Sequence, residues 1–91
     1  EEALQLFNKA LQANPNRGWA WNNMGITLNR LSMYNDALKA FNKAIEINPT
    51  SARAWHNKAN TLYNLGKYEE SMRTYNKAIE LDPLLYAGIN K

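Results

Sequence analysis

The chain contains no cysteine, which excludes disulfide bonds, thiolate metal sites and cysteine nucleophiles. Histidine occurs once, at His56, so a metal site built on a pair of histidines is excluded as well. No apolar run approaches the roughly 18 residues that indicate a membrane span, and no signal-peptide pattern occurs. We therefore expect no insertion into a membrane. The lack of cysteine also fits a reducing location, and we expect the cytoplasm.

Motifs for catalysis are missing too. The sequence has no glycine-rich phosphate loop, no Ser-His-Asp set and no lysine in a nucleotide-binding motif. All of its carboxylates except Glu1 and Glu2 fit helix starts, helix ends or solvated helix faces, so they do not require a catalytic explanation. We expect no enzyme activity within these residues and no cofactor.

The charge of the chain is modest and dispersed. Eleven basic residues give a formal net charge of +3 over 91 residues, and they form no block of like charge. A nucleic-acid interface would instead show a clustered basic stripe, so RNA binding is only a disfavoured alternative. The length fits one small domain. Because the chain begins at Glu1 and not at methionine, we expect it to be part of a longer protein.

A fixed period of 34 residues runs through the sequence. Pro15, Pro49 and Pro83 are separated by two equal steps of 34, and Trp21 and Trp55 are separated by the same step. Aligning the chain with itself at this step gives 21 identities in 57 pairs. A constant period in the range of about 20–50 residues is typical of stacked repeat proteins.

Apolar residues within each period follow the i, i+3, i+4, i+7 spacing of amphipathic helices. Each proline stops one helix shortly before the next begins. Gly66 can take the left-handed conformation that ends a helix, whereas Ser32 lies at the same position one period earlier. We expect the turn at Ser32 to be strained or differently closed. The predicted helices span residues 1–14, 18–31, 34–48, 52–65 and 68–82, with another start at about residue 85.

Large and small residues recur in the same order in both complete units. The first unit carries Trp21, Met24, Gly25, Leu28, Tyr34, Ala37, Phe41, Ala44 and Pro49. The second carries Trp55, Lys58, Ala59, Leu62, Tyr68, Ser71, Tyr75, Ala78 and Pro83. This order resembles the tetratricopeptide repeat.

The resemblance implies an all-α fold in which antiparallel helix hairpins stack as a right-handed α-solenoid. It divides a single domain, residues 1–91, into the second helix of a preceding repeat (1–17), two repeats (18–51 and 52–85) and the start of a further helix (86–91). Small residues would let helices approach, and the aromatic residues would fill the remaining space. Two departures, Lys58 and Ser71, predict a looser second hairpin. The Ser71 hydroxyl is expected to bond a carbonyl of its own helix, and the Lys58 stem to lie along apolar surface.

In this family the first helix of each repeat lines a concave surface that binds a peptide. Asn23 and Asn57 lie one period apart and resemble an asparagine ladder that grips a peptide backbone; alternatively, asparagine is simply common at this position. Trp19 is a candidate anchor, or it packs on the N-terminal helix. The candidate groove residues are Trp19, Asn22, Asn23, Ile26, Arg30, Arg53, Asn57, Asn60, Tyr63 and Asn64, with Asn29 and His56 on the same helix faces.

A protein or peptide is thus the expected partner. A subgroup of the family clamps the carboxylate of chaperone tails with lysine and asparagine, and here Asn22, Ile26 and Ala87 depart from that pattern while Asn57 and Lys91 match it. The alternative is a homo-oligomer formed by end-to-end stacking or by exchange of a terminal helix. The apolar residues that would support it are Leu4, Phe7 and Leu11 at one end and Leu84, Leu85, Tyr86 and Ile89 at the other.

Overall fold

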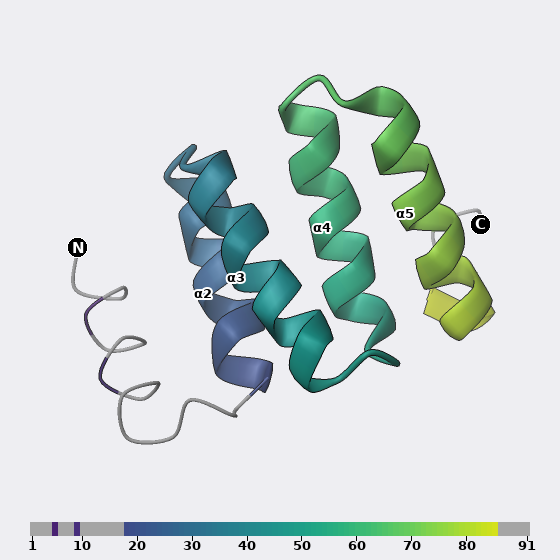
Figure 1. The fold of residues 1–91 in the computed structure, drawn as a ribbon, viewed down its shortest axis with the longest axis horizontal. Coiled ribbons are helices and arrows are strands. Elements are labelled where there is room, and N and C mark those ends of the chain that lie inside the picture. The colour runs from purple at the N-terminus through teal and green to yellow at the C-terminus, as the bar shows by residue number, and fades with distance from the viewer. Residues whose placement is uncertain (1–4, 6–8, 10–17, 86–91) are drawn as a thin grey trace.

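Two antiparallel helix hairpins lie side by side in the computed structural model, which describes residues 5, 9 and 18–85 (Figure 1). The first hairpin pairs α2 with α3 and the second pairs α4 with α5, and α4 also packs against α3. The described residues contain no β-strand, so the predicted all-α fold is confirmed. The elements are α2 (Gly18–Arg30), α3 (Tyr34–Ile47), α4 (Ala52–Asn64), α5 (Tyr68–Leu81) and the short 3-10 helix η1 (Pro83–Leu85).

The four predicted helices within the described residues have the right starts, and each ends one residue earlier than expected. Asn48 and Asp82 precede prolines, and they close α3 and α5 by donating their backbone N–H groups to the carbonyls of Ala44 and Ala78. At the start of α4 the Ser51 hydroxyl accepts a hydrogen bond from the backbone N–H of Ala54. The predicted helix at 1–14 and the tail 86–91 lie outside the described residues.

Phe41 of α3 is the centre of the first hairpin. Its side chain is fully buried with Leu28, Ala37 and Ala40, and Trp21 packs partly buried against this cluster. A Cβ placed on Gly25 of α2 would lie only 2.5 Å from the Phe41 ring, so α2 and α3 meet where a side chain is absent.

The aromatic residues of the second hairpin are less buried than their pattern predicts. Tyr68, expected to fill core space, is 60% exposed. Trp55 is only half-buried, and its indole N–H donates a 2.8 Å hydrogen bond to the carbonyl of Pro49. A cation–aromatic contact adds to this arrangement, because the Lys58 ammonium lies 5.6 Å from the centre of the Trp55 ring. Trp55 therefore ties the loop after α3 to the first turns of α4.

Ser71 stabilises the second hairpin in a way that sequence reasoning missed. Its hydroxyl donates a 2.8 Å hydrogen bond to the Ala59 carbonyl of the facing helix α4, not to a carbonyl of its own helix α5. The predicted bond within α5 is wrong because the side chain is buried at the helix contact, where the Ala59 carbonyl lies within reach. The position therefore adds a polar link between α4 and α5 and does not by itself loosen the hairpin.

Both hairpin turns close in the same way. Ser32 has φ of 61° and Gly66 has φ of 80°, so each residue occupies the left-handed region. In the first turn the N–H of Met33 bonds the carbonyl of Leu28, and in the second Lys67 bonds Leu62 equivalently. The sequence predicts that the turn at Ser32 is either strained or differently closed. It is strained, because a side chain is unfavourable at this φ.

Exchanging the residue types at the two turns is expected to change stability in opposite directions. Ser32→Gly should raise the free energy of unfolding by about 1 kcal/mol, since it relieves the left-handed serine. Gly66→Ser should lower it by about 1 kcal/mol, because a serine would then occupy the left-handed conformation. No atom lies within 4 Å of a Cβ placed at Gly66, so a steric clash does not add to this cost. Urea denaturation of both variants measures the effects; equal signs would contradict the backbone explanation.

Candidate binding groove

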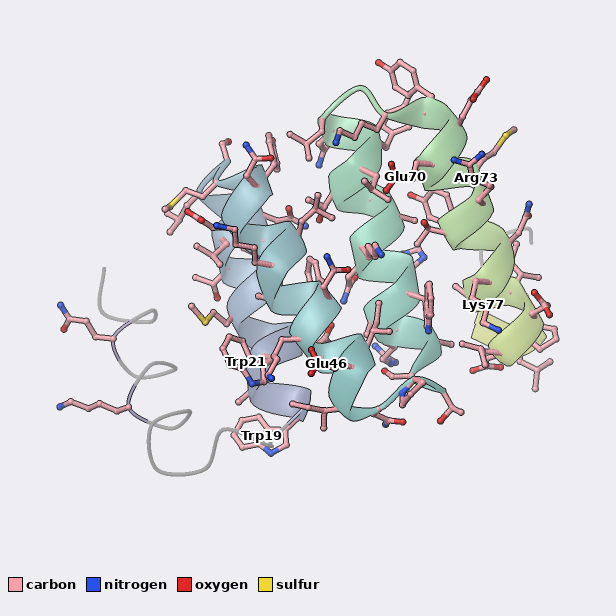
Figure 2. All side chains as sticks on the ribbon, viewed as in Figure 1. Trp19, Trp21, Glu46, Glu70, Arg73 and Lys77 are labelled. Atoms are coloured by element: carbon pink, nitrogen blue, oxygen red, sulfur yellow. The ribbon has the colours of Figure 1, made fainter. Side chains whose placement is uncertain are left out.

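A cavity of about 450 Å³ lies where the first turns of α2 and α4 meet the last turn of α3. Trp19 at the start of α2 is 55% exposed, and Arg53 at the start of α4 is also exposed. Figure 2 shows Trp19 at the N-terminal end of α2, beyond Trp21. We call this cavity the α2–α4 groove; it is lined by Gly18, Trp19, Asn22, Ala44, Ile47, Asn48, Ser51 and Arg53.

The groove joins three residues that the sequence predicted as binding candidates, Trp19, Asn22 and Arg53. Sequence reasoning missed the wall made by the end of α3, where Ala44 and Ile47 contribute apolar surface. The 34-residue pattern assigns these two positions to the core stripe, so nothing in the sequence marks them as part of a cavity.

Asn22 and Asn57 connect α2 to α4. The Asn57 Nδ2 amide donates a 3.1 Å hydrogen bond to Asn22 Oδ1, and both side chains are half-buried. The remaining amide atoms are a donor, Asn22 Nδ2, and an acceptor, Asn57 Oδ1. Asn23, the predicted partner of Asn57 in a ladder, follows Asn22 in the sequence and is exposed. The side chain that Asn57 bonds is thus that of Asn22.

A second polar link between the same helices is formed by Thr61. Its hydroxyl bonds Asn29 Oδ1 at 2.9 Å and the carbonyl of Asn57 at 3.0 Å. Because Thr61 is fully buried, this hydroxyl needs such partners, and the bond to Asn29 fixes the position of α4 against α2. The two links hold the first helices, and hence the groove walls, in a defined relative position.

Asn60 is engaged on both sides of its amide. Its Nδ2 lies 3.2 Å from His56 Nε2, and its Oδ1 accepts a hydrogen bond from the Tyr75 hydroxyl. The His56 and Tyr75 rings also meet edge to face, with their centres 5.6 Å apart. Burial, and secondarily the charge of Arg53, lowers the pKa of His56. Burial, followed by interaction with Tyr63, raises the pKa of Tyr75.

Acidification is expected to weaken the fold through His56. Since the folded-state pKa lies below the unfolded value of about 6.5, the unfolded chain binds more protons. The contribution of His56 to stability is therefore complete above pH 6.5 and is lost as pH falls through 6.5 toward the folded pKa. Thermal melts between pH 8 and pH 5 should show this slope in the native chain, and His56→Gln should flatten it. An unchanged slope in His56→Gln would contradict the assignment.

The other predicted groove residues do not gather in one place. Ile26 packs partly buried against the core cluster, so its expected orientation away from the core is wrong. It lies five residues after Trp21, and its side chain reaches the edge of the same cluster. Arg30 and Asn64 are exposed at the far ends of α2 and α4. Tyr63 lines a different cavity.

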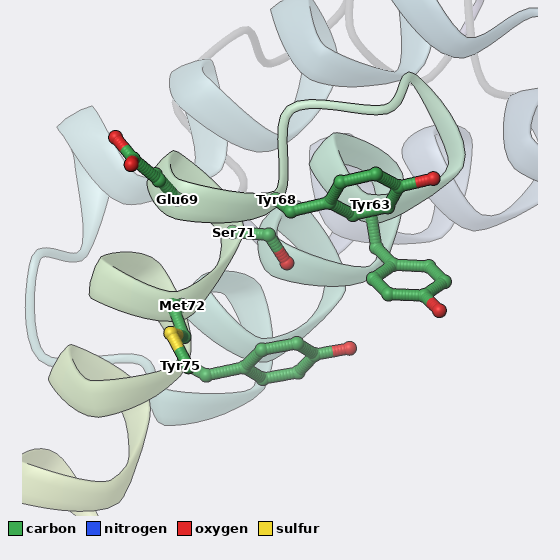
Figure 3. A pocket seen from close by; sticks show the side chains of 6 residues that line it. All are labelled: Tyr63, Tyr68, Glu69, Ser71, Met72 and Tyr75. Atoms are coloured by element: carbon green, nitrogen blue, oxygen red, sulfur yellow. The ribbon is translucent and has the colours of Figure 1, made fainter.

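This second cavity has a volume of about 470 Å³ and lies on α4 and α5 (Figure 3). The Tyr63 and Tyr68 rings meet edge to face with centres 5.0 Å apart, and Met72 is 68% exposed. We call it the tyrosine cavity; its lining residues are Tyr63, Tyr68, Glu69, Ser71, Met72 and Tyr75.

Within residues 5, 9 and 18–85, no helix is long and apolar enough to cross a membrane. In the same part of the chain, no three His, Cys, Asp or Glu side chains gather in a way that would hold a metal ion.

Helix hairpins that repeat every 34 residues, with small residues at the helix contacts, define a helical-repeat protein. The tetratricopeptide repeat model matches residues 18–51 and 52–83, and a protein prenyltransferase alpha subunit repeat model matches residues 1–31. The chain belongs to the tetratricopeptide repeat family. Proteins of this family bind other proteins and are typically non-catalytic, so the chain is a protein-interaction module.

Solved structures of MamA are similar to this chain. The structure described as MamA MSR-1 has 26% sequence identity to this chain and a TM-score of 0.84. The match covers 88% of this chain and 46% of the MamA chain. A structure of MamA AMB-1 has 26% sequence identity to this chain and a TM-score of 0.82. This match covers 87% of this chain and 46% of the MamA chain. The chain thus spans slightly less than half the length of these structures. No curated protein sequence is significantly similar to it.

Proposed function

We propose that this chain is a non-catalytic module that binds an extended segment of a partner protein in the α2–α4 groove. The observation that carries the proposal is the meeting of Trp19, Asn22 and Arg53 at one cavity. These three side chains offer an aromatic surface, an amide and a cation within one binding site. Tryptophan and arginine are both enriched among the few residues that dominate protein interfaces.

The asparagine pair supports recognition of a peptide backbone. Asn22 Nδ2 and Asn57 Oδ1 are a neighbouring donor and acceptor, because the hydrogen bond between the two side chains uses their other atoms. An extended residue offers one carbonyl acceptor and one N–H donor. The pair on α2 and α4 therefore complements a peptide backbone better than the predicted pair of Asn23 and Asn57.

A selection from a random peptide library, with peptides about ten residues long, tests the proposal. Such a peptide spans about 33 Å when extended, more than the roughly 10 Å between neighbouring helices. Selected peptides would be labelled, and their dissociation constants measured by fluorescence anisotropy. Trp19→Ala should weaken binding at least tenfold, or about 1.4 kcal/mol, because it removes the aromatic anchor.

Tyr68→Ala is the matched control. Tyr68 is about as exposed as Trp19, at 60% against 55%, but it lines the tyrosine cavity. Its removal should leave the affinity of the selected peptides unchanged. If the library yields no binder, or if Tyr68→Ala weakens binding while Trp19→Ala does not, the proposed groove is wrong.

Self-association is a second candidate, favoured by the tyrosine cavity. One repeat earlier, the positions of Tyr68 and Met72 are held by Tyr34 and Leu38 of α3, which are half-buried in the hairpin against which α4 packs. The equivalent surface on α5 has Tyr68 and Met72 more than half exposed. A helix from a second copy would cover the same kind of surface that α4 covers on α3.

Sedimentation at increasing protein concentration tests this second candidate. The native chain should form dimers or larger assemblies, and Met72→Glu should shift it toward the monomer by placing a charge on the apolar surface. A native chain that stays monomeric at every concentration would contradict self-association.

A further inference from the structure

Among the described helices α2 to α5, acidic residues occur only in the second helix of each hairpin, whereas basic residues occur in both kinds of helix. The first helices, α2 and α4, contain no aspartate or glutamate, and their charged residues are Arg30, Arg53 and Lys58. The carboxylates of the described helices all belong to the second helices, α3 and α5. Figure 2 shows two of them, Glu46 on α3 and Glu70 on α5. The helices that supply Trp19, Asn22 and Arg53 are thus free of negative charge.

The α2–α4 groove repeats this division on a smaller scale. Among the described residues that line it, Arg53 is the only charged one, and none is a carboxylate. Within the described part of the chain, no carboxylate lies within ion-pair distance of Arg53, whereas Lys43 and Glu46 on α3 form a pair at 3.6 Å. The guanidinium of Arg53 is exposed, and its fork of N–H donors matches a carboxylate.

We propose that the partner segment is acidic and places a carboxylate side chain on Arg53 beside a large apolar side chain on Trp19. This inference rests on the proposed function, since it names the chemistry of the segment that the groove would bind. Ala44 and Ile47 add apolar surface to the same cavity. The groove thus fits an acidic residue and an apolar residue close together in one extended segment.

A protein segment fits these features better than RNA. The described part of the groove offers a single cation, whereas binding to a phosphate backbone requires basic residues that follow the strand. The Asn22–Asn57 pair presents one donor and one acceptor, which complement a peptide unit. Single-stranded RNA is therefore the competing ligand in the test.

The composition and behaviour of selected library peptides test the inference. Peptides recovered with the native chain should be enriched in aspartate and glutamate next to leucine, phenylalanine or a similar residue. Replacing their carboxylates by amides should weaken binding at least tenfold in low salt. This preference should shrink as salt is raised toward 1 M, where the screening length is about 3 Å. Oligouridine should not displace the bound peptide.

Two arginine variants locate the effect. Arg53→Gln should bind the acidic peptide and its amide counterpart equally, since the cation that distinguishes them is gone. Arg73→Gln is the matched control, because Arg73 is an exposed arginine on α5, outside the groove. It should keep the full preference for the acidic peptide.

The outcomes separate this inference from the proposed function. Binders that depend on Trp19 but tolerate the loss of their carboxylates would overturn the acidic partner and leave the groove intact. Displacement of the peptide by oligouridine, or an equal loss of preference in Arg73→Gln, would also overturn the acidic partner. A library that yields no binder at all would overturn the proposed function itself.

Discussion

Phe41→Ala is expected to lower the free energy of unfolding by about 3–5 kcal/mol, the range for truncating a fully buried aromatic side chain. Phe41 has no exposed surface, and Leu28, Ala37 and Ala40 pack around it. The surrounding residues cannot close the resulting cavity without moving α2 toward α3. Small domains have only about 5–15 kcal/mol of total stability, so a large part of it would be lost.

Tyr75→Ala provides the comparison for this effect. Tyr75 stands 34 residues after Phe41 and holds the equivalent position in the second hairpin, but it is only half-buried. Its truncation should therefore cost clearly less, although it also removes the hydrogen bond to Asn60. Urea denaturation curves of both variants give the two values. A larger cost for Tyr75→Ala would contradict the placement of the core in the first hairpin.

Gly25→Ala is expected to lower the free energy of unfolding by about 1–3 kcal/mol through overpacking. The added methyl would lie 2.5–2.7 Å from three ring atoms of Phe41, closer than such atoms approach in proteins. At an open helix position the same substitution would stabilise by about 1 kcal/mol, because alanine favours the helix over glycine. The sign of the change thus reports the contact with Phe41.

The double variant Gly25→Ala, Phe41→Leu tests the cause. Leucine removes the ring atoms that the new methyl would strike, so the two substitutions should cost less together than the sum of their separate costs. Ala59→Gly is the control at the equivalent position of α4, where an alanine is already accommodated. It should destabilise by about 2 kcal/mol, because glycine lowers helix propensity and the substitution removes a fully buried methyl group. A stabilising Gly25→Ala would contradict the described packing.

The four helices α2 to α5 could be predicted within one residue because the period, the prolines and the turn residues all act locally. Pro49 stops α3 wherever the chain goes next, and the apolar spacing indicates the buried face of each helix, with Ile26 of α2 as an exception. The burial of the aromatic residues could not be predicted in the same way. Tyr34 and Tyr68 are identical in the repeat pattern, yet Tyr34 is half-buried and Tyr68 is 60% exposed. The two hairpins also differ in their surroundings: α4 packs against α3, while among the described residues no further hairpin packs against α5.

The candidate site was predictable only in part. Helix geometry places Trp19 and Arg53 at equivalent positions one period apart, and the structure brings both to one cavity. The sequence does not show that Asn57 bonds Asn22, or that Asn60 bonds His56 and Tyr75. Two of these hydrogen bonds join residues on different helices, and the contact between Asn60 and His56 is one of several that Asn60 could make within α4. All three depend on interatomic distances, which a repeat pattern does not contain. Their roles in binding a partner stay predictions.

Amide NMR shifts of the chain, titrated with an acidic library peptide, test the central claim most directly. We predict that the largest changes occur at the indole N–H of Trp19, the side-chain amide of Asn22 and the backbone of Arg53. Arg73 and Lys77 on α5 should show little change. Shifts confined to Tyr63, Tyr68 and Met72, or spread over α3 and α5 with Trp19 unchanged, would contradict binding in the α2–α4 groove.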